Sequence, residues 1–436
     1  MGGISWKAGW QALWADEGAL SRRDHRRALA PALLAALLLR LAVLAFFPQP
    51  VAHDALVYDA LAVHLLSGQG YVLEPGDLPT ATRGPAYPFF LTGLYALFGR
   101  RYGAVFVSQA LLDLAVVALT YALAWLLYRR RAAATLAAWG YALYLPAALQ
   151  TGQVMTETVF TLLLMAGVTA YLQGVQGRRA GVWLAGAGAA LGLATLTRPA
   201  ASGMPLVLAA ALPWLVGGNP VRGKRAGLRL AAPLLLTAAL VLAPWVWRNW
   251  QIFGAFIPTS TLGGVNLYIS HYALDQDDYL AAHTSEGAKR AIIWTRVIEN
   301  EPGALNEVQL DALYQQKALA LIRQYPLRYL HLALNRSVRL WVNLGYPNEP
   351  PSAASWALAA LHGALLIVAQ MALRERGQAA RRAGVLWALL AYYTLFHMAV
   401  LAYVRFVFPV MPLVMVLAGR GLGFLVGRPM GEEAHA

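Results

Sequence analysis

The feature that most constrains this chain is a series of apolar runs, each long enough to cross a lipid bilayer as a helix. A helical span needs about 20 mostly apolar residues, and runs of that length recur along most of the 436 residues. Only 13% of the residues are charged, whereas a soluble protein has about a quarter. The chain cannot cover a water-facing surface of its size. The sequence therefore predicts an all-α polytopic membrane protein.

The spacing of the runs predicts about ten transmembrane helices and two large outer loops, 48–100 and 249–354, which carry interfacial amphipathic helices. The expected spans are 29–47, 104–128, 132–149, 157–176, 181–196, 200–217, 230–248, 355–373, 384–404 and 406–426. Shorter helices are expected at 53–66, 85–98 and 307–345, the last broken by Pro326. These boundaries divide the chain into an N-terminal transmembrane module (1–248), an outer-face loop region (249–354) and C-terminal transmembrane helices (355–436).

The basic residues favour a membrane topology over a nucleic-acid partner. The net charge is +14, from 35 Lys and Arg against 21 Asp and Glu, which in a soluble domain would suggest nucleic acid. Here the basic residues cluster at the ends of apolar runs, for example at 22–27, 129–131 and 374–382, as expected of cytoplasmic loops. We therefore expect a multi-pass protein of the cell membrane, with both termini cytoplasmic and both large loops outside.

Asp54 is the first candidate for chemistry, because a carboxylate near a membrane is costly to place. It follows the first span by a few residues, and on a helix it would share a face with Tyr58, one turn further on. A partly desolvated carboxylate can serve as a general base. Asp is also a preferred N-cap, and a helix is expected to begin here. The pattern alone leaves both interpretations open.

Two further carboxylates lie at or inside the spans. Glu157 falls in the first turn of a span, on the same predicted outer side as Asp54. A helix start favours an acidic residue there through the dipole, so Glu157 alone would be ordinary, but two carboxylates at one membrane face favour a functional site. Asp113 lies inside the second span with no obvious charged neighbour, and we interpret it as a polar contact between helices or a protonated acid.

Four arginines fall on the predicted outer side, against the trend of the other basic residues: Arg83, Arg198, Arg248 and Arg405. A guanidinium binds phosphate well because it is planar, always charged and offers several donors. Snorkelling to lipid headgroups is the alternative. Four such residues at span ends favour an anionic ligand.

Other chemistries lack the residues they need. The chain has no cysteine, which excludes disulfides, thiolate metal sites and cysteine nucleophiles. The histidines show no zinc-site spacing, and no phosphate-binding glycine loop or nucleophile elbow is present. No cofactor follows from the residues, and a divalent metal is left open.

Several of these residues lie in short motifs that resemble the bacterial members of glycosyltransferase family 39, part of the GT-C superfamily. That family contains the protein O-mannosyltransferases and the lipid A aminoarabinose transferases. The matching segments are Asp54 with Tyr58, 68–71, 83–88, 97–99, 156–160, 195–199, 244–249, the amphipathic segment 323–341, and Arg405 with Pro409 and Pro412.

The resemblance implies a GT-C fold and an inverting transferase that takes a sugar from a polyprenyl-phosphate donor at the outer face, with 1–248 as the catalytic module. The family's catalytic aspartate corresponds to Asp54, and its second acidic residue to Glu157. The four arginines, together with Tyr58, Tyr87 and Asn249 from the matching motifs, become candidates for binding substrate. One departure is His53, which stands where many relatives carry a second acidic residue.

The chemistry of such a transfer fits these residue types. The acceptor loses a proton as it attacks the anomeric carbon, and a positioned carboxylate can take that proton. The leaving group is a phosphate, so cationic groups can stabilise its growing charge. The expected partners are the lipid-linked donor, a glycan, lipid or protein acceptor, and membrane lipids, with no nucleic acid. The alternative functions are a transporter or flippase of lipid-linked sugars and a non-catalytic assembly partner.

Overall fold

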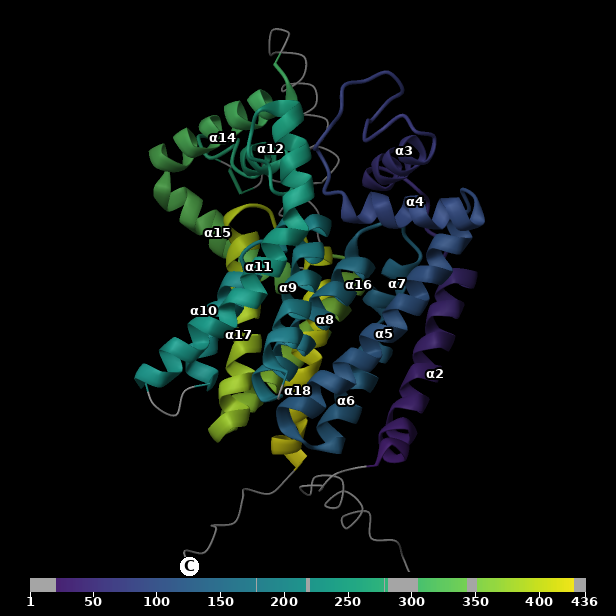
Figure 1. The fold of residues 1–436 in the computed structure, drawn as a ribbon, viewed down its shortest axis with the longest axis vertical. Helices are drawn as coiled ribbons and strands as arrows, with labels where there is room; N and C mark the ends of the chain where they lie inside the picture. Colours follow the sequence, from purple (N-terminus) through teal and green to yellow (C-terminus); the bar gives the residue numbers. More distant parts are fainter. Residues whose placement is uncertain are drawn as a thin grey trace, which may run out of the picture.

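The computed structural model of the chain describes residues 21–177, 179–216, 220–277, 279–280, 305–342 and 351–426. Within these ranges every regular element is a helix and no strand occurs. The helices form a long bundle with a tier of shorter helices at its upper end (Figure 1). The all-α prediction is therefore confirmed. Both chain ends, and residues 281–304 and 343–350 of the second predicted outer loop, lie outside the described residues.

The bundle has a helix at each predicted span position. They are α2 (Arg22–Phe46), α5 (Tyr102–Tyr128), α6 (Arg131–Ala142) followed by α7 (Leu145–Thr151), α8 (Glu157–Gln176), α9 (Ala180–Thr197), α10 (Met204–Val216), α11 (Pro220–Phe253), α16 (Ala353–Gln370), α17 (Gly377–Ala399) and α18 (Met411–Val426). Short 3-10 turns join some of them: η1 (Pro199–Ala201), η2 (Met371–Arg374), η3 (Val404–Phe406) and η4 (Phe408–Val410).

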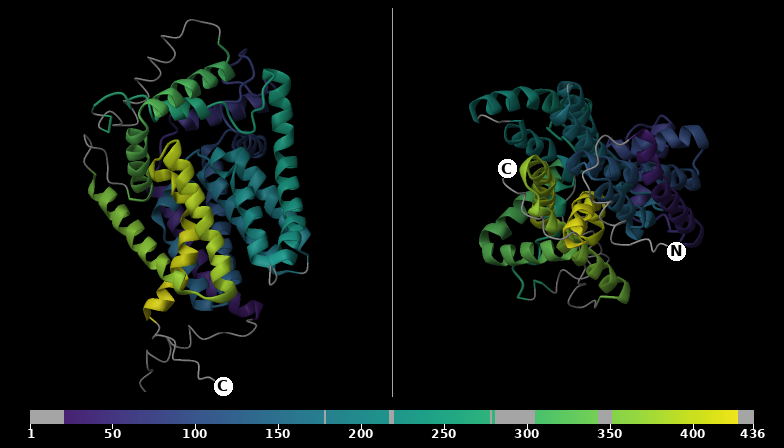
Figure 2. Two further views of the ribbon diagram at one scale, coloured as in Figure 1. Left: turned by 90° about the vertical axis from the view of Figure 1, so that its left-hand side faces the viewer. Right: turned by 90° about the horizontal axis from the view of Figure 1, so that it is seen from below.

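The number of spans differs slightly from the expected ten. By length and composition, the described residues hold eight helices that could cross a membrane, or nine if α6 and α7 form one bent span. The remaining expected span, 384–404, corresponds to α17, which lies beside α10 and α18 (Figures 1 and 2). Arg381 and Arg382 in its second turn, with Tyr392 and Tyr393 further along, lower its hydropathy.

The predicted span 132–149 is bent rather than straight. The axes of α6 and α7 differ by 53°, and Pro146 lies in the first turn of α7. In a continuous helix the ring of Pro146 would clash with the carbonyl of Ala142, and its missing N–H would leave that carbonyl without its donor. The chain therefore breaks after Ala142 and restarts near the upper end of the bundle (Figure 1).

Small residues let α18 occupy the centre of the bundle, and 89% of the most apolar stretch of the span Val404–Leu425, which includes most of α18, is buried. A Cβ at Gly419 would meet the backbone oxygen of Ala133 at 2.5 Å, and a Cβ at Gly421 would collide with the backbone of Val368. Helices in a membrane pack closely through such small residues, since the lipid supplies no hydrophobic drive between them. The sequence of α18 therefore brings α6 and α16 into direct backbone contact with it.

Asp113 corrects one expectation, because it does have a charged neighbour. Its Oδ2 accepts from Arg40 Nε at 2.9 Å and from Arg40 Nη2 at 2.7 Å, and its Oδ1 accepts from the Tyr141 hydroxyl at 2.7 Å. The network joins α2, α5 and α6, so the expected polar contact between helices is confirmed. Arg40 lies 73 positions away in sequence, which is why the local pattern gave no sign of it.

The upper tier contains the short helices of the two large loops, including one at Gly263–Ile269 that was not expected. They are α3 (Asp54–Leu66), α4 (Ala86–Phe98), α12 (Gly263–Ile269), α14 (Glu307–Gln324) and α15 (Pro326–Trp341). The expected helices at 53–66 and 85–98 and the break at Pro326 are thus confirmed. Helix α4 runs across the top of the bundle in Figure 1, and α14 runs across it in the side view of Figure 2.

The basic ends of the spans lie opposite this tier. The ends of α5, α8, α10 and α16 and the starts of α2, α6, α9, α11 and α17 all lie at the lower end in Figure 1. The His25 ring of α2 packs 4.7 Å from the Trp125 ring near the end of α5. Arg420 of α18 forms an ion pair with Glu375 just after η2. The fold therefore separates a basic end from the tier of short helices.

Candidate active site

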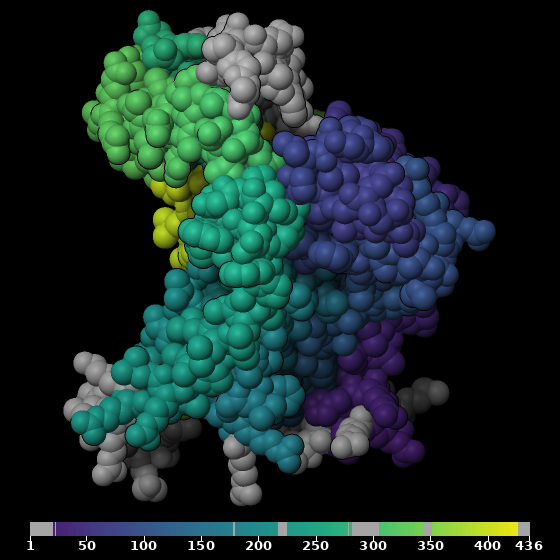
Figure 3. Space-filling view, turned by 45° about the horizontal axis from the view of Figure 1, so that its top comes forward, coloured from purple at the N-terminus to yellow at the C-terminus, as the bar shows by residue number. Residues whose placement is uncertain are grey.

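A cavity of about 460 Å³ lies between the upper tier and the top of the bundle. Figure 3 shows this upper face, with α3 and α4 in purple to blue, the end of α11 in teal and α14–α15 in green. Six of the nine residues predicted for the site line the cavity: Asp54, Tyr58, Arg83, Glu157, Arg198 and Arg405. They come from separate parts of the chain, so the fold alone brings them together.

Asp54 follows a tight turn at the start of α3. The Ala55 N–H donates to the Ala52 carbonyl at 3.1 Å, and between them His53 has φ 55° and ψ −122°. These angles match the first central position of a type II′ turn, at about 60° and −120°, where glycine is preferred. A non-glycine residue in so sparsely populated a conformation costs about 1–3 kcal/mol. Asp54 is the first helical residue rather than the N-cap, so the cap interpretation does not hold.

The Asp54 carboxylate lies between two arginines. Arg83 Nη2 is 3.0 Å from its Oδ1, and Arg405 Nη2 is 3.4 Å from its Oδ2. The three side chains are 27%, 20% and 29% exposed, in the order Asp54, Arg83, Arg405. The site is therefore electrostatically paired but open to the cavity.

Aromatic rings support both arginines independently of Asp54. The Arg83 guanidinium lies 5.9 Å from the centre of the Tyr58 ring, and the Arg405 guanidinium lies 5.4 Å from that of Phe406. Such cation–π contacts contribute about 0.5–1 kcal/mol at exposed sites. Burial raises the pKa of the Tyr58 phenol, which stays protonated and can donate a hydrogen bond into the cavity.

The second carboxylate, Glu157, forms a more buried pair. Its Oε1 lies 2.8 Å from Arg198 Nη1, with side chains only 3% and 13% exposed. The Arg198 guanidinium also lies 4.9 Å from the Phe406 ring centre. Burial acts to lower the pKa of Arg198, but the Glu157 carboxylate outweighs it and the pKa is raised. Phe406 thus lies beside both Arg198 and Arg405.

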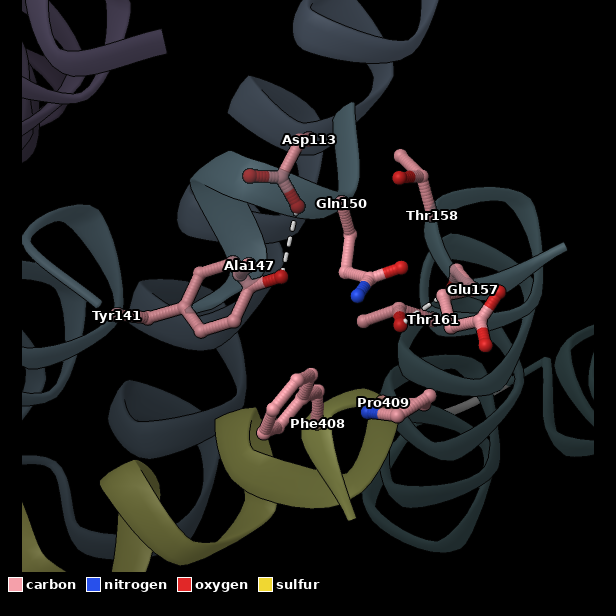
Figure 4. A pocket seen from close by; sticks show the side chains of 9 residues that line it. All are labelled: Asp113, Tyr141, Ala147, Gln150, Glu157, Thr158, Thr161, Phe408 and Pro409. Carbon is pink, nitrogen blue, oxygen red and sulfur yellow. Dashed lines mark hydrogen bonds between the residues drawn. The ribbon is translucent and has the colours of Figure 1, made fainter. Parts of the chain in front are cut away.

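Figure 4 shows a second, much smaller space behind Glu157, inside the bundle. Asp113 and Tyr141 lie on one side of it, Glu157 on the other, and Gln150 between them. Its volume is about 10 Å³, which is at the lower limit for holding one water molecule. Glu157 therefore borders both the open cavity and the buried Asp113 network.

The other three predicted site residues lie outside the cavity lining. Tyr87 is fully buried and donates from its hydroxyl to Gln109 Oε1 at 3.0 Å. Its ring packs edge-on against Tyr58 at 5.2 Å, so it supports a lining residue from behind.

Arg248 and Asn249, at the upper end of α11, hold loop backbone. Arg248 Nη1 donates to the Thr80 carbonyl at 2.7 Å, and Asn249 Nδ2 donates to the Ile257 carbonyl at 3.0 Å. The Arg248 guanidinium also lies 4.8 Å from the Trp245 ring centre. Both side chains fix the loops that border the cavity.

Glu307 is a cavity residue that the sequence did not single out. It begins α14, and its carboxylate accepts from the Thr80 hydroxyl at 2.7 Å, the Ala81 N–H at 2.6 Å and the Thr261 hydroxyl at 3.0 Å. Asn306 before it forms a capping box, which is the only local signal here and marks a helix start. The partners lie 226 and 46 positions away, so no local pattern could have identified this contact.

The loop that carries Arg83 is pressed closely against α9. A Cβ at Gly84 would collide with the carbonyl oxygen of Leu196, and the Tyr71 hydroxyl donates to the Arg83 carbonyl at 2.9 Å. Together with Glu307, these contacts fix the loop backbone that carries the Arg83 side chain. The Arg83-Gly84-Pro85 segment thus needs glycine for close approach.

Within this one cavity, a carboxylate can accept a proton and guanidinium groups can stabilise negative charge. Among the described residues, no three His, Asp or Glu side chains converge as they would to hold a metal ion. A divalent metal stays a prediction without a candidate ligand set there.

Comparison with known proteins adds to this geometry. A protein-family model described as dolichyl-phosphate-mannose-protein mannosyltransferase matches residues 82–247, a segment that includes Arg83, Glu157 and Arg198. A search of curated proteins finds no relative of significant similarity.

Solved structures share the fold at low sequence identity. The oligosaccharyltransferase of Archaeoglobus fulgidus, tethered to an acceptor peptide, aligns with a TM-score of 0.58 and 15% identity over 93% of this chain and 50% of its own. The same enzyme, AglB, with an inhibitory peptide and a dolichol-phosphate aligns with a TM-score of 0.56 and 14% identity, over 92% and 50%. ArnT of Cupriavidus metallidurans bound to undecaprenyl phosphate gives a TM-score of 0.43 and 17% identity, over 90% and 78%.

The chain spans about half the length of the archaeal enzyme that it matches. The likeness at this identity concerns the fold alone, which the chain shares with the archaeal oligosaccharyltransferase. The matched family segment and the shared fold together confirm the resemblance to GT-C glycosyltransferases of family 39.

Proposed function

We propose that the protein is an inverting glycosyltransferase that moves a sugar from a polyprenyl-phosphate donor to an acceptor at the outer face of the cell membrane. The observation that carries this proposal is Asp54, placed in a 460 Å³ cavity within ion-pair distance of Arg83 and Arg405. A base and two phosphate-binding cations thus occupy one site. The family description names a dolichyl-phosphate mannose donor, and AglB was solved with a dolichol-phosphate.

In this proposal Asp54 is the general base. The acceptor hydroxyl or amine loses its proton to the Asp54 carboxylate as it attacks the anomeric carbon. The bond from that carbon to the phosphate oxygen breaks, and its electron pair leaves with the phosphate. A single displacement of this kind inverts the anomeric centre and needs no nucleophile from the enzyme.

The arginines stabilise the departing phosphate. Arg83 and Arg405 present guanidinium groups to the same point of the cavity, where donors aimed at developing charge are most effective. Glu157 and Arg198, already paired, shape the neighbouring wall and position the acceptor. The acceptor class, whether glycan, lipid or protein, depends on the shape of the cavity beyond these groups.

The polarity of the bundle supports the outer-face location that we propose. The basic span ends lie opposite the upper tier of helices (Figure 1), whose residues line the cavity together with the top of the bundle, and basic span ends usually remain in the cytoplasm. Single cysteines introduced at Gly76 and Asp277 should therefore react with an impermeant thiol reagent in intact cells. A cysteine at Gly223 should be protected. Labelling at Gly223 with protection at the other two positions would place the cavity on the cytoplasmic side.

The function is tested by Asp54→Asn. We expect this variant to lose about a hundredfold or more in sugar transfer, the usual contribution of a positioned base. Asp77→Asn, in the same loop but exposed, serves as the matched control and should transfer at the normal rate. Substrates for the assay can be identified by mass spectrometry of lipid-linked sugars and surface glycans in a strain that lacks the protein. Near-normal transfer by Asp54→Asn would remove the base assignment.

A transport assay separates the enzyme from a transporter or flippase. A transporter moves a lipid-linked sugar without breaking its glycosidic bond, so vesicles holding the protein would show translocation and no cleaved prenyl phosphate. We expect the reverse, with release of prenyl phosphate only when an acceptor is present.

A further inference from the structure

The charged residues that line the cavity balance one another. Three carboxylates, from Asp54, Glu157 and Glu307, face three guanidinium groups, from Arg83, Arg198 and Arg405. A donor phosphate brings additional negative charge into this balanced set. It can gain strong charge-assisted hydrogen bonds only if some guanidinium turns from its carboxylate to the phosphate.

The three carboxylates differ in how firmly they are held. Glu157 and Arg198 form the most buried pair, at 2.8 Å. Glu307 is held by two hydroxyls and a backbone N–H. Asp54 has the longest ion-pair contacts, at 3.0 and 3.4 Å, with partly exposed partners. The Asp54 pairs are longer than the Glu157–Arg198 pair and more open to solvent, which screens them more, so they are the less costly ion pairs to break.

The two arginines can change partners without leaving their places. Each lies beside an aromatic ring, Arg83 beside Tyr58 and Arg405 beside Phe406. The Arg83 loop is also fixed by the backbone contact at Gly84 and by Glu307. When the carboxylate is released, both guanidinium groups remain in the cavity.

We propose that the donor phosphate and Asp54 compete for Arg83 and Arg405, so that donor binding releases the carboxylate to act as base. This inference rests on the proposed function and adds the order of its steps: the donor binds first, and the base is released afterwards. A carboxylate paired with cations holds its charge and accepts a proton less readily than a released one. The base is therefore restrained until the donor arrives. The acceptor proton then passes to Asp54 as the phosphate leaves with the electron pair of the broken glycosidic bond.

The proposal predicts that Asp54→Asn, which should abolish transfer, strengthens binding of a prenyl phosphate. The probe is farnesyl phosphate, titrated calorimetrically into the full-length protein in detergent at fixed ionic strength. We expect affinity about tenfold above wild type, because the neutral amide of the variant no longer competes for two charge-assisted contacts. Farnesol, which lacks the phosphate, should show no such gain.

Two further variants make the test specific. Arg405→Ala should bind farnesyl phosphate more weakly than wild type, and combining it with Asp54→Asn should remove part of the gain, which a double-mutant cycle measures. Asp59→Asn is the matched control, because Asp59 lies on the same helix and pairs with Arg100 at 2.5 Å outside the cavity lining. Its affinity for the probe should stay that of wild type.

The outcomes distinguish this inference from the function on which it rests. If Asp54→Asn abolishes transfer but binds farnesyl phosphate no more tightly than wild type, competition is overturned and the base assignment stands. An equal gain in Asp59→Asn overturns it as well. If Asp54→Asn keeps normal transfer, or wild type binds no prenyl phosphate, the proposed function itself fails.

Discussion

Asp113 and Asp54 both form ion pairs with arginine, but in opposite surroundings. Near the middle of α5, the Asp113 side chain is 2% exposed and that of its partner Arg40 is 0% exposed. At the upper end of the bundle, the Asp54 side chain is 27% exposed, and its two partners are of similar exposure. The same two residue types thus form a closed pair in one place and an open cluster in the other.

The two sites also differ in how closely the charges are held. Both Asp113 oxygens accept hydrogen bonds of 2.9 Å or less, and Arg40 further donates to backbone carbonyls of Ala36 and Ala142. The Asp54 oxygens meet their arginine nitrogens at the longer distances of 3.0 and 3.4 Å. A closed network holds helices together, whereas an open one can exchange its partners for a ligand. Exposure and closeness of pairing therefore separate the structural role of Asp113 from the catalytic role that we propose for Asp54.

The largest expected effect breaks the closed pair. Asp113→Asn keeps the shape of the side chain but leaves the Arg40 charge buried without a counter-ion. We expect the free energy of unfolding to fall by about 3–5 kcal/mol, measured by denaturant titration in detergent with tryptophan fluorescence. The double variant Arg40→Leu with Asp113→Leu should recover most of the loss, because no buried charge remains. A single variant as stable as wild type would show that the pair is not structural.

An intermediate effect is expected where the open site is held in place. Glu307→Ala leaves the Thr80 and Thr261 hydroxyls and the Ala81 N–H without their acceptor, at a cost of about 1–3 kcal/mol in stability. The loop that carries Arg83 should loosen, so the KM for the donor should rise. Glu307→Gln keeps an acceptor oxygen, so its stability and its donor KM should lie between those of Glu307→Ala and wild type. Exposed Glu74→Gln is the control, and an unchanged donor KM in Glu307→Ala would separate this carboxylate from the Arg83 loop.

The smallest expected effect sharpens the description of the open site. Arg405→Lys keeps the positive charge but loses the planar fork, so donor KM should rise only about threefold to tenfold, whereas Arg405→Ala should raise it much further. Stability should change far less than in Asp113→Asn, since the Arg405–Asp54 pair is partly open to solvent and its contact is 3.4 Å long. Donor titrations measure the KM, and equal values for Arg, Lys and Ala would mean that Arg405 does not contact the phosphate.

Much of the fold was predictable because its causes are local. Apolar runs of bilayer length mark the spans, and Pro326 ends one helix and begins the next as expected. The bend after Ala142 also has a local cause in Pro146, but the apolar character of 132–149 concealed it. The apolar pattern at 384–404 also predicted a span, but the polar residues of α17 lower its hydropathy, and it is not among the helices that are apolar enough to cross a membrane.

The candidate site was predictable only in part. Helix periodicity placed Asp54 and Tyr58 on one face, and both line the cavity. Span ends placed the arginines on one side of the membrane, yet they serve different purposes. Arg83, Arg198 and Arg405 line the cavity, while Arg248 donates to the Thr80 carbonyl. The same residue type at a span end gives no indication of which way its side chain turns.

The sequence by itself determined the helices, the two ends of the bundle and the residue types available at each end, because hydropathy and charge act along the chain. Only the tertiary structure decided which charges meet. Arg405 reaches Asp54 across 351 positions, and Glu307 reaches Ala81 across 226. Such contacts depend on how each helix is rotated and packed against its neighbours. Close packing through residues such as Gly84 and Gly419 sets that rotation, and no local pattern encodes it.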